Sequence, residues 1–113
     1  MKDSNTEIGL PDVIVAYWSA ANAGSILEAC QCFSPNSVVR DESQTHQGTE
    51  AIGLWIADTT RKYHPSVEPL RWQKMDERYH VTAKVSGTFP GSPVELEYVF
   101  TLENEKISHL EVQ

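Results

Sequence analysis

The sequence predicts an α+β domain in which a cone-shaped, curved antiparallel sheet wraps three N-terminal helices, in the order ααβαββββ. Apolar residues recur at helical spacing before Pro65, whereas period-two alternation dominates after it. Helices that precede a meander can cover only one face of its sheet, and a sheet that twists around them leaves a conical hollow. Hydrophobic content of 40% over 113 residues suffices for one packed core. We therefore expect a single domain over residues 1–113, with a flexible tail at 1–9 and a ligand pocket in the hollow.

The net charge of the chain limits the classes of partner that it is expected to bind. Nine basic against sixteen acidic side chains give a net charge of −7, and the basic residues are scattered singly. Without a basic stripe, nucleic acid is not expected as a partner, and the negative field disfavours an anionic membrane surface. No apolar run approaches the roughly 20 residues of a membrane span, and the polar residues 1–7 do not resemble a secretory signal. We expect a cytoplasmic protein that binds a small apolar molecule.

Two helices are predicted in the first third of the chain. Pro11 suits a first helical turn, and the segment 22–24 (Asn-Ala-Gly) closes that helix. Ser25 and Glu28 match a capping box, in which each side chain accepts from the other residue's free backbone N–H. The inward face of the first helix should hold Val13, Ile14, Tyr17, Trp18 and Ala21. The short second helix should direct inward Leu27, Cys30 and Phe33.

The two cysteines, Cys30 and Cys32, are interpreted as small buried or half-buried hydrophobes. Two positions apart on a helix, their side chains diverge by about 200°, so they cannot easily bridge each other. No second ligand pair has the spacing of a zinc site. A redox or metal role is the less favoured alternative.

A strand and a third helix follow. The β-branched run 37–41 should form the strand, and the polar residues 42–47 should form a loop. Thr49 can cap the next helix, with Glu50 favourably placed against the helix dipole. The inward face of this helix is predicted to hold Ile52, Trp55, Ile56, Thr59 and Tyr63.

The rest of the chain is predicted to be sheet. Turn-forming residues at 76–77, 90–93 and 103–105 divide it into four strands joined as consecutive hairpins. The clearest alternation places on one face Tyr79, Val81, Ala83 and Val85, and further along Leu96, Tyr98, Phe100 and Leu102.

The order of these elements and several motifs resemble the nuclear transport factor 2-like superfamily, which includes ketosteroid isomerases, scytalone dehydratase, limonene epoxide hydrolase and SnoaL-type polyketide cyclases. The resemblance covers nearly the whole chain and is carried by residues 17–24, 33–41 and 48–55 and by the hairpin around Lys106-Ile107. It implies a SnoaL-like or ketosteroid isomerase-like pocket domain that pairs as a homodimer through its sheet. Because the superfamily hosts many activities, function must be argued from the site.

The candidate acid-base pair is Tyr17 and Asp41. They lie 24 positions apart, and the resemblance matches them to the oxyanion-hole tyrosine and the proton-abstracting aspartate of the ketosteroid isomerases. A carboxylate in an apolar cavity gains basicity by desolvation, and a phenol can donate to an oxygen on which charge develops. Strand alternation places Asp41 on the same face as Val39. In the alternative reading, Asp41 is solvated or paired with Arg40 or a loop amide, and Tyr17 only packs.

The third member of the isomerase site is a protonated aspartate on a later strand, and no aspartate occurs here after Asp76. Counting back from Lys106 leads to Glu97 or, with one residue fewer in the hairpin, to Tyr98. Tyr98 is favoured because the strand face that contains it buries far more apolar surface. A true steroid isomerase is therefore not expected.

The remaining pocket wall is predicted from position on these faces. His46 precedes the third helix near the expected opening and is either a proton shuttle or an exposed loop residue. The other histidines have no metal-ligand spacing, and the chain has neither a glycine-rich phosphate loop nor a nucleophile elbow, so no metal or cofactor is expected. The substrate-binding residues are predicted to be Trp55, Val39, Ile52, Ile56, Phe100 and Trp18, although core packing is the commoner role for tryptophan.

Two functions follow from this sequence. The first is a cofactor-independent isomerase, dehydratase or cyclase that moves protons on a small carbonyl compound, with Asp41 as base and Tyr17 or Tyr98 as donor. The second is a non-catalytic module of the same fold that holds a hydrophobic ligand or a partner protein. An apolar pocket that contains Asp41 favours the first, and an Asp41 that points to solvent favours the second.

Overall fold

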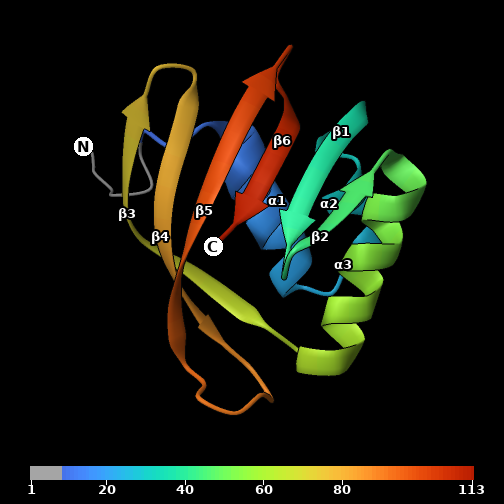
Figure 1. Ribbon diagram of the computed structural model, residues 1–113, viewed down its shortest axis with the longest axis vertical. Helices are drawn as coiled ribbons and strands as arrows, with labels where there is room; N and C mark the ends of the chain where they lie inside the picture. Colours follow the sequence, from blue (N-terminus) through green and yellow to red (C-terminus); the bar gives the residue numbers. More distant parts are fainter. Residues whose placement is uncertain (1–8) are drawn as a thin grey trace.

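The computed structural model describes residues 9–113, so the tail predicted at 1–9 lies, apart from Gly9, outside the described residues. The three helices are α1 (Asp12–Asn22), α2 (Ile26–Cys30) and α3 (Thr49–Tyr63). The strands are β1 (Phe33–Asp41), β2 (Gln44–Gln47), β3 (Ser66–Met75), β4 (Arg78–Ser86), β5 (Val94–Glu103) and β6 (Lys106–Val112). The predicted α+β class and the four consecutive C-terminal strands are confirmed (Figure 1).

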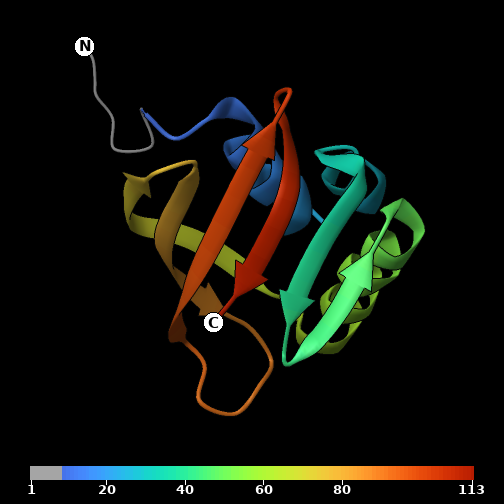
Figure 2. The ribbon, with the colours of Figure 1, turned by 45° about the horizontal axis from the view of Figure 1, so that its top comes forward.

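The six strands form one curved, open sheet in the order β2-β1-β6-β5-β4-β3. Neighbours pair antiparallel, as predicted, except that β1 runs parallel to β6, with Val39 opposite Leu110. After the edge strand β2 the chain leaves the sheet, forms α3 and re-enters the sheet at the opposite edge as β3. The strands β3 to β6 then lead back across the sheet, so that β6 lies beside β1 and points the same way (Figure 2).

Strand β2 replaces the loop predicted at residues 42–47. Glu42 and Ser43 have φ angles of 55° and 64°, which is the left-handed geometry of a two-residue hairpin turn. The turn pairs Asp41 with Gln44 and places β2 at the edge of the sheet. Its sequence, Gln-Thr-His-Gln, has no apolar alternation because three of its four residues are exposed, so the pattern carried no strand signal.

The core lies between the concave face of the sheet and the helices. Figures 1 and 2 show all three helices on the same side of the sheet. From the sheet, Val81, Phe100 and Leu110 are fully buried, and they face Ile14 of α1 and Ile52 of α3 within one cluster of buried residues. Burying an aliphatic or aromatic side chain of this size contributes about 1.5–3 kcal/mol each. This packing holds α1 and α3 at a fixed distance from the sheet.

Some local predictions on α2 are wrong. Leu27 is 71% exposed, and Phe33 is buried as the first residue of β1 and not as part of the helix. The helix is only five residues long and directs Ala29 inward. The side chains of Ser25 and Glu28 bond each other at 3.1 Å and leave the backbone N–H groups uncapped, so the two residues do not form a capping box.

Helix α3 begins one residue earlier than a Thr49 cap requires. Gly48 is the N-cap, with a φ angle of 90° that glycine adopts without strain, and Thr49 is the first helical residue. None of the three helices described has the length and hydrophobicity that a membrane crossing requires.

Candidate functional site

A cavity of about 340 Å³ lies between α1, α3 and the concave face of the sheet. At one end its lining includes Tyr63 of α3 and the half-buried Phe89 and exposed Pro90 of the β4–β5 loop, and Figure 1 shows that this loop and the end of α3 lie at the same end of the molecule. Its size falls within the usual range for small-molecule sites. The described residues that line it are Tyr17, Trp18, Ala21, Asn22, Asp41, Glu42, Trp55, Ile56, Thr59, Thr60, Tyr63, Pro65, Val67, Val85, Phe89, Pro90, Val94, Leu96, Tyr98 and Val112.

Tyr17 is held at the inner end of the cavity by aromatic packing. Its position on α1 directs the ring toward the sheet, where it is 5% exposed. Phe33 meets the Tyr17 ring edge-on at a centroid distance of 5.3 Å. Trp18, the next residue of α1, also lines the cavity and meets the rings of Tyr98 and Phe100 edge-on at 5.2 and 5.3 Å. Such edge-to-face contacts restrict the ring positions of both α1 residues.

Tyr98, and not Glu97, faces the cavity, as the apolar alternation predicted. Tyr98 stacks over Phe100 on the same face of β5 at 6.2 Å. Glu97 points to the opposite face, where it bonds the imidazole of His80 on β4 at 3.2 Å. The choice between the two residues is therefore settled by the pleat of the strand.

The two phenols are protonated donors. Burial, the largest cause, raises the pKa of Tyr17 well above its usual range, and the nearby Tyr98 and Asp41 raise it further. Burial also raises the pKa of Tyr98, with a further contribution from the charge of Asp41. Neither hydroxyl has a hydrogen-bond partner among residues 9–113. Both O–H groups are thus free to donate to a bound molecule at neutral pH.

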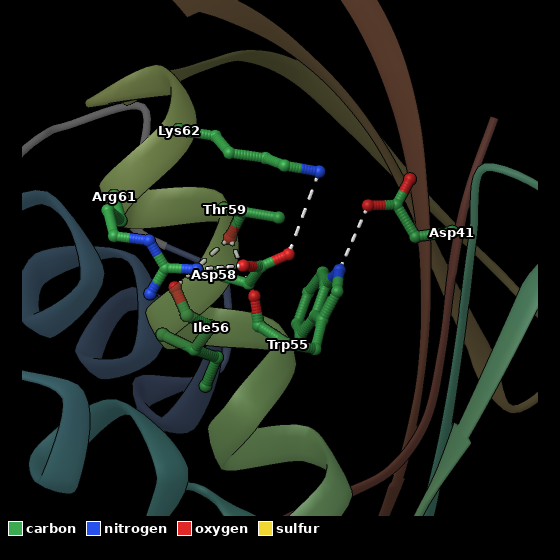
Figure 3. Close-up of polar contacts among 7 residues, drawn as sticks. All are labelled: Asp41, Trp55, Ile56, Asp58, Thr59, Arg61 and Lys62. Carbon is green, nitrogen blue, oxygen red and sulfur yellow. Dashed lines mark hydrogen bonds and ion pairs between the residues drawn. The ribbon is translucent and has the colours of Figure 1, made fainter.

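Asp41 ends β1 immediately before the hairpin turn, where its side chain contacts α3. The indole Nε1–H of Trp55 donates to its Oδ2 at 3.0 Å (Figure 3). The partner is therefore a helix tryptophan and neither Arg40 nor a loop amide. Because one carboxylate oxygen accepts this bond, Trp55 fixes the orientation of Asp41 relative to the cavity that both residues line.

A second, outer groove adjoins the cavity at Trp55. The groove has a volume of about 400 Å³ and shares with the cavity the residues Asp41, Glu42, Trp55, Thr59 and Tyr63. On the groove side the ring of His46 stacks on Trp55 at 6.0 Å. The remaining charged residues of the groove are Glu42, Asp58, Arg61 and Lys62, and both of these basic side chains bond Asp58 (Figure 3). Asp41 therefore has an apolar chamber on one side and a polar groove on the other.

Several polar residues of the cavity wall are already bonded to backbone. Asn22 exchanges two hydrogen bonds of 2.9 Å with the backbone of Val67, which joins α1 to β3. Thr59 donates to the carbonyl oxygens of Trp55 and Ile56 in its own helix (Figure 3). The inner end of the cavity consequently offers a ligand two phenols and one carboxylate.

The predicted substrate-binding residues divide into two groups. Trp18, Trp55 and Ile56 line the cavity. Val39, Ile52 and Phe100 are fully buried in the core and are not among the lining residues, so that part of the prediction is corrected. Their side chains lie on the expected faces, but packing between the helices and the sheet buries them in the core, away from the cavity.

The sequence did not identify the residues at the mouth of the cavity. Phe89 and Pro90 of the β4–β5 loop line this mouth together with Tyr63, whose ring meets Phe89 edge-on at 5.9 Å. The backbone N–H of Thr88 donates to the carbonyl of Tyr63 at 2.8 Å, and a Cβ on Gly87 would collide with that same carbonyl. The Gly87 and Phe89-Pro90 pattern reads as an ordinary turn, so only tertiary contact with α3 reveals its place in the site.

The cysteines occupy half-buried and buried positions, as predicted. Cys30 donates to the carbonyl of Thr49 at 3.3 Å, and Cys32 lies beside the backbone of Glu28. Burial raises the pKa of both thiols, which disfavours the reactive thiolate. No group of three or more potential metal ligands is found within residues 9–113.

Neither the family models nor the curated proteins include a match to this sequence. Among solved structures, a provisionally described polyketide cyclase from Sinorhizobium meliloti is 37% identical, with a TM-score of 0.92, and the match covers 96% of this chain and all of that one. A protein of ketosteroid isomerase-like fold from Catenulispora acidiphila, in complex with trimethylamine, has 17% identity and a TM-score of 0.79 over 91% of this chain and 85% of its own. The chain belongs to the SnoaL-like branch of the nuclear transport factor 2-like superfamily.

A third structure extends the range of chemistry found on this SnoaL-like fold. It is an epoxide hydrolase/cyclase-like enzyme with a role in pyran ring formation in the polyether salinomycin. It is 17% identical to this SnoaL-like chain, with a TM-score of 0.79 over 94% of this chain and 90% of its own. At that identity the likeness shows the fold alone. The SnoaL-like domain also departs from the ketosteroid isomerase pattern of a protonated aspartate in the site, because β3 to β6 contribute the phenol of Tyr98 and no carboxylate to the described cavity lining.

Proposed function

We propose that this SnoaL-like protein is a cofactor-independent enzyme that catalyses proton transfer on a small, largely apolar carbonyl compound. The observation that supports the proposal is that Asp41, Tyr17 and Tyr98 line the same cavity, whose other walls are mostly apolar. A base and two uncommitted hydrogen-bond donors that converge on one apolar space are what enolisation of a carbonyl compound requires.

In this mechanism Asp41 removes a proton from the carbon next to the carbonyl group. The electron pair of the broken C–H bond moves onto the carbonyl oxygen, which accepts hydrogen bonds from Tyr17 and Tyr98. Because both phenols have a raised pKa, they donate a hydrogen bond without giving up the proton. Each preorganised donor to such an oxyanion is typically worth about 100- to 1000-fold in rate.

The fate of the enolate defines the reaction class. Return of the proton to another carbon gives isomerisation, loss of a β-hydroxyl as water gives dehydration, and attack on a second carbonyl carbon closes a ring. The description of the Sinorhizobium meliloti protein as a polyketide cyclase supports the third outcome, with a substrate that carries several ketone groups.

The test combines turnover and binding with a panel of small ketones and diketones. Wild-type protein should accelerate exchange of the α-hydrogen with deuterated water or ring closure of at least one compound. Asp41→Asn should reduce that rate by about 1000-fold or more while the protein remains folded. Asp76→Asn, the same substitution in the exposed β3–β4 turn, is the matched control and should keep the wild-type rate.

Binding without any turnover would replace the enzymatic proposal with the alternative, a ligand-binding module of the same fold. In that case Asp41→Asn and Asp76→Asn would both leave the chemistry at the uncatalysed rate.

We also propose that the protein forms a homodimer through the outer face of its sheet. The resemblance implies this arrangement. The outer face is the one that the helices leave uncovered, and it carries half-buried residues such as Thr82 and Val38.

A further inference from the structure

We propose that the ligand of this cavity carries a positively charged alkylammonium group in addition to its carbonyl. This inference deepens the proposed function, because it names the charge of the substrate that the same site would accept. It depends on three features of the cavity wall: its charge, its aromatic content and the uncompensated position of Asp41.

The first feature is the charge of the wall. Two carboxylates, Asp41 and Glu42, line the cavity, and none of its described lining residues is a lysine, an arginine or a histidine. The charge of Asp41 acts on the interior, since after burial it is one of the causes that raise the pKa of Tyr17 and of Tyr98. A bound molecule therefore experiences a negative field from the wall.

The basic side chains of the adjoining groove pair with another carboxylate. Arg61 and Lys62 line the outer groove and not the cavity, and both bond Asp58 (Figure 3). His46 stacks on the groove side of Trp55. Among residues 9–113, the hydrogen-bond donor to the Asp41 carboxylate is a neutral indole N–H, which orients the carboxylate but brings no positive charge.

The second feature is the aromatic content. Six aromatic side chains line the cavity, and four of them are at least nine-tenths buried: Tyr17, Trp18, Trp55 and Tyr98. The faces of aromatic rings carry partial negative charge and attract alkylammonium groups, most strongly where water is excluded. Rings of this kind combined with a carboxylate are a common recognition site for quaternary ammonium ions.

The third feature follows from conservation of charge during proton transfer. When Asp41 takes a proton, it becomes neutral and the substrate becomes an enolate, so the step moves one negative charge from the wall to the substrate without changing the net charge of the cavity. No described lining residue offsets that charge. A positive group on the substrate would neutralise it throughout, and a negative group would double it in a medium of low dielectric constant.

The experiment uses three methyl ketones of equal chain length that differ only at the far end. One ends in trimethylammonium, one in the isosteric tert-butyl group and one in carboxylate. Dissociation constants for the wild type are measured by calorimetry, and the indole N–H resonances of Trp18 and Trp55 report whether each compound occupies the cavity. We expect the trimethylammonium ketone to bind at least tenfold more tightly than the tert-butyl ketone, with the carboxylate weakest.

Two variants separate the cavity from the general attraction of an acidic protein for cations. Asp41→Asn and Asp76→Asn change the net charge equally, but only Asp41 faces the ligand. The advantage of the cationic ketone over the tert-butyl ketone should fall by about tenfold in Asp41→Asn and should be unchanged in Asp76→Asn.

The inference is overturned if the tert-butyl or carboxylate ketone binds as tightly as the cationic one, or if none of the three shifts the indole resonances. Its failure is distinct from that of the proposed function. Tight, charge-selective binding without exchange of the α-hydrogen would support the inference and count against catalysis. Exchange on the neutral ketone alone would support catalysis and count against the inference.

Discussion

At the scale of single residues, the chemistry of the site depends on the few polar side chains of the cavity wall that can still bond a ligand. Asn22 and Thr59 bond backbone, whereas the hydroxyls of Tyr17 and Tyr98 have no partner among the described residues. Asp41 keeps one oxygen in the hydrogen bond from Trp55. The polarity available to a ligand is therefore concentrated at one end of an otherwise apolar space.

The hydrogen bond from Trp55 to Asp41 should be measurable by comparing two tryptophan variants. Trp55→Phe removes an indole donor bound to a carboxylate, and hydrogen bonds to charged groups contribute about 1.5–3 kcal/mol. Trp18→Phe removes a buried indole N–H that has no hydrogen-bond partner in the described chain. Both lose the same volume, so the urea unfolding free energy should fall further for Trp55→Phe. Equal losses would contradict an energetic role for the bond.

Tyr17 and Tyr98 should make the protein sensitive to alkaline pH. Burial raises the pKa of both phenols in the folded state above the value of about 10 for an unfolded tyrosine. The folded state therefore retains protons that the unfolded state releases, so stability is fully present below about pH 10 and declines above it. Urea midpoints measured between pH 8 and 11 should show this decline, and Tyr98→Phe should flatten it. A midpoint that stays constant across this range would be inconsistent with buried phenols.

At the scale of elements, the helices and strands position the site through a few close contacts. Helix α3 supplies Trp55 from its middle and Tyr63 from its end, so it contributes to the inner wall and to the mouth. The β4–β5 loop reaches the same mouth because Thr88 bonds the carbonyl of Tyr63. Displacing that loop should change the opening without touching Asp41.

Two glycine substitutions should change the free energy of unfolding in opposite directions. Gly87→Ala should destabilise the protein by about 1–3 kcal/mol, since its Cβ meets the fixed backbone carbonyl of Tyr63. Gly53→Ala, inside α3, meets only the Sγ of Cys30 at an ordinary contact distance of 3.6 Å. It should stabilise the protein by about 0.5–1 kcal/mol because alanine is the better helix former. Thermal and urea unfolding of both variants give the comparison, and a stable Gly87→Ala protein would show that the loop can move away.

At the scale of the whole molecule, one face of the sheet is covered by helices and the other is not (Figure 2). If the uncovered face forms the proposed homodimer, sedimentation should give about twice the 12.7 kDa mass of the chain. Thr82→Arg places a large charge on that face, between Val81 and Ala83, which point inward, and should shift the protein to monomer. Leu54→Arg, on the exposed side of α3, is the control and should leave the dimer intact. A monomer in the wild type would refute the pairing.

Much of the fold was predictable because it depends on periodicity. The apolar spacing of Ile14, Tyr17 and Trp18 and the alternation of Leu96, Tyr98 and Phe100 each bury one face, and burial is the largest favourable term in folding. The same alternation identified Tyr98 as the inward residue in place of Glu97. Strand β2 was not predictable, because an edge strand held by backbone hydrogen bonds needs no apolar pattern.

The sequence alone determined the fold class, the inward faces and the candidates Tyr17, Asp41 and Tyr98, because these follow from local spacing and from the requirement to bury apolar area. Only the tertiary structure decided which inward residues reach the cavity and which, like Val39, Ile52 and Phe100, are sealed in the core. It also decided that Trp55 bonds Asp41 and that the wall carries no basic residue within the described chain. The physical reason is that a cavity is the space left between elements distant in sequence, and no local pattern encodes the distance between them.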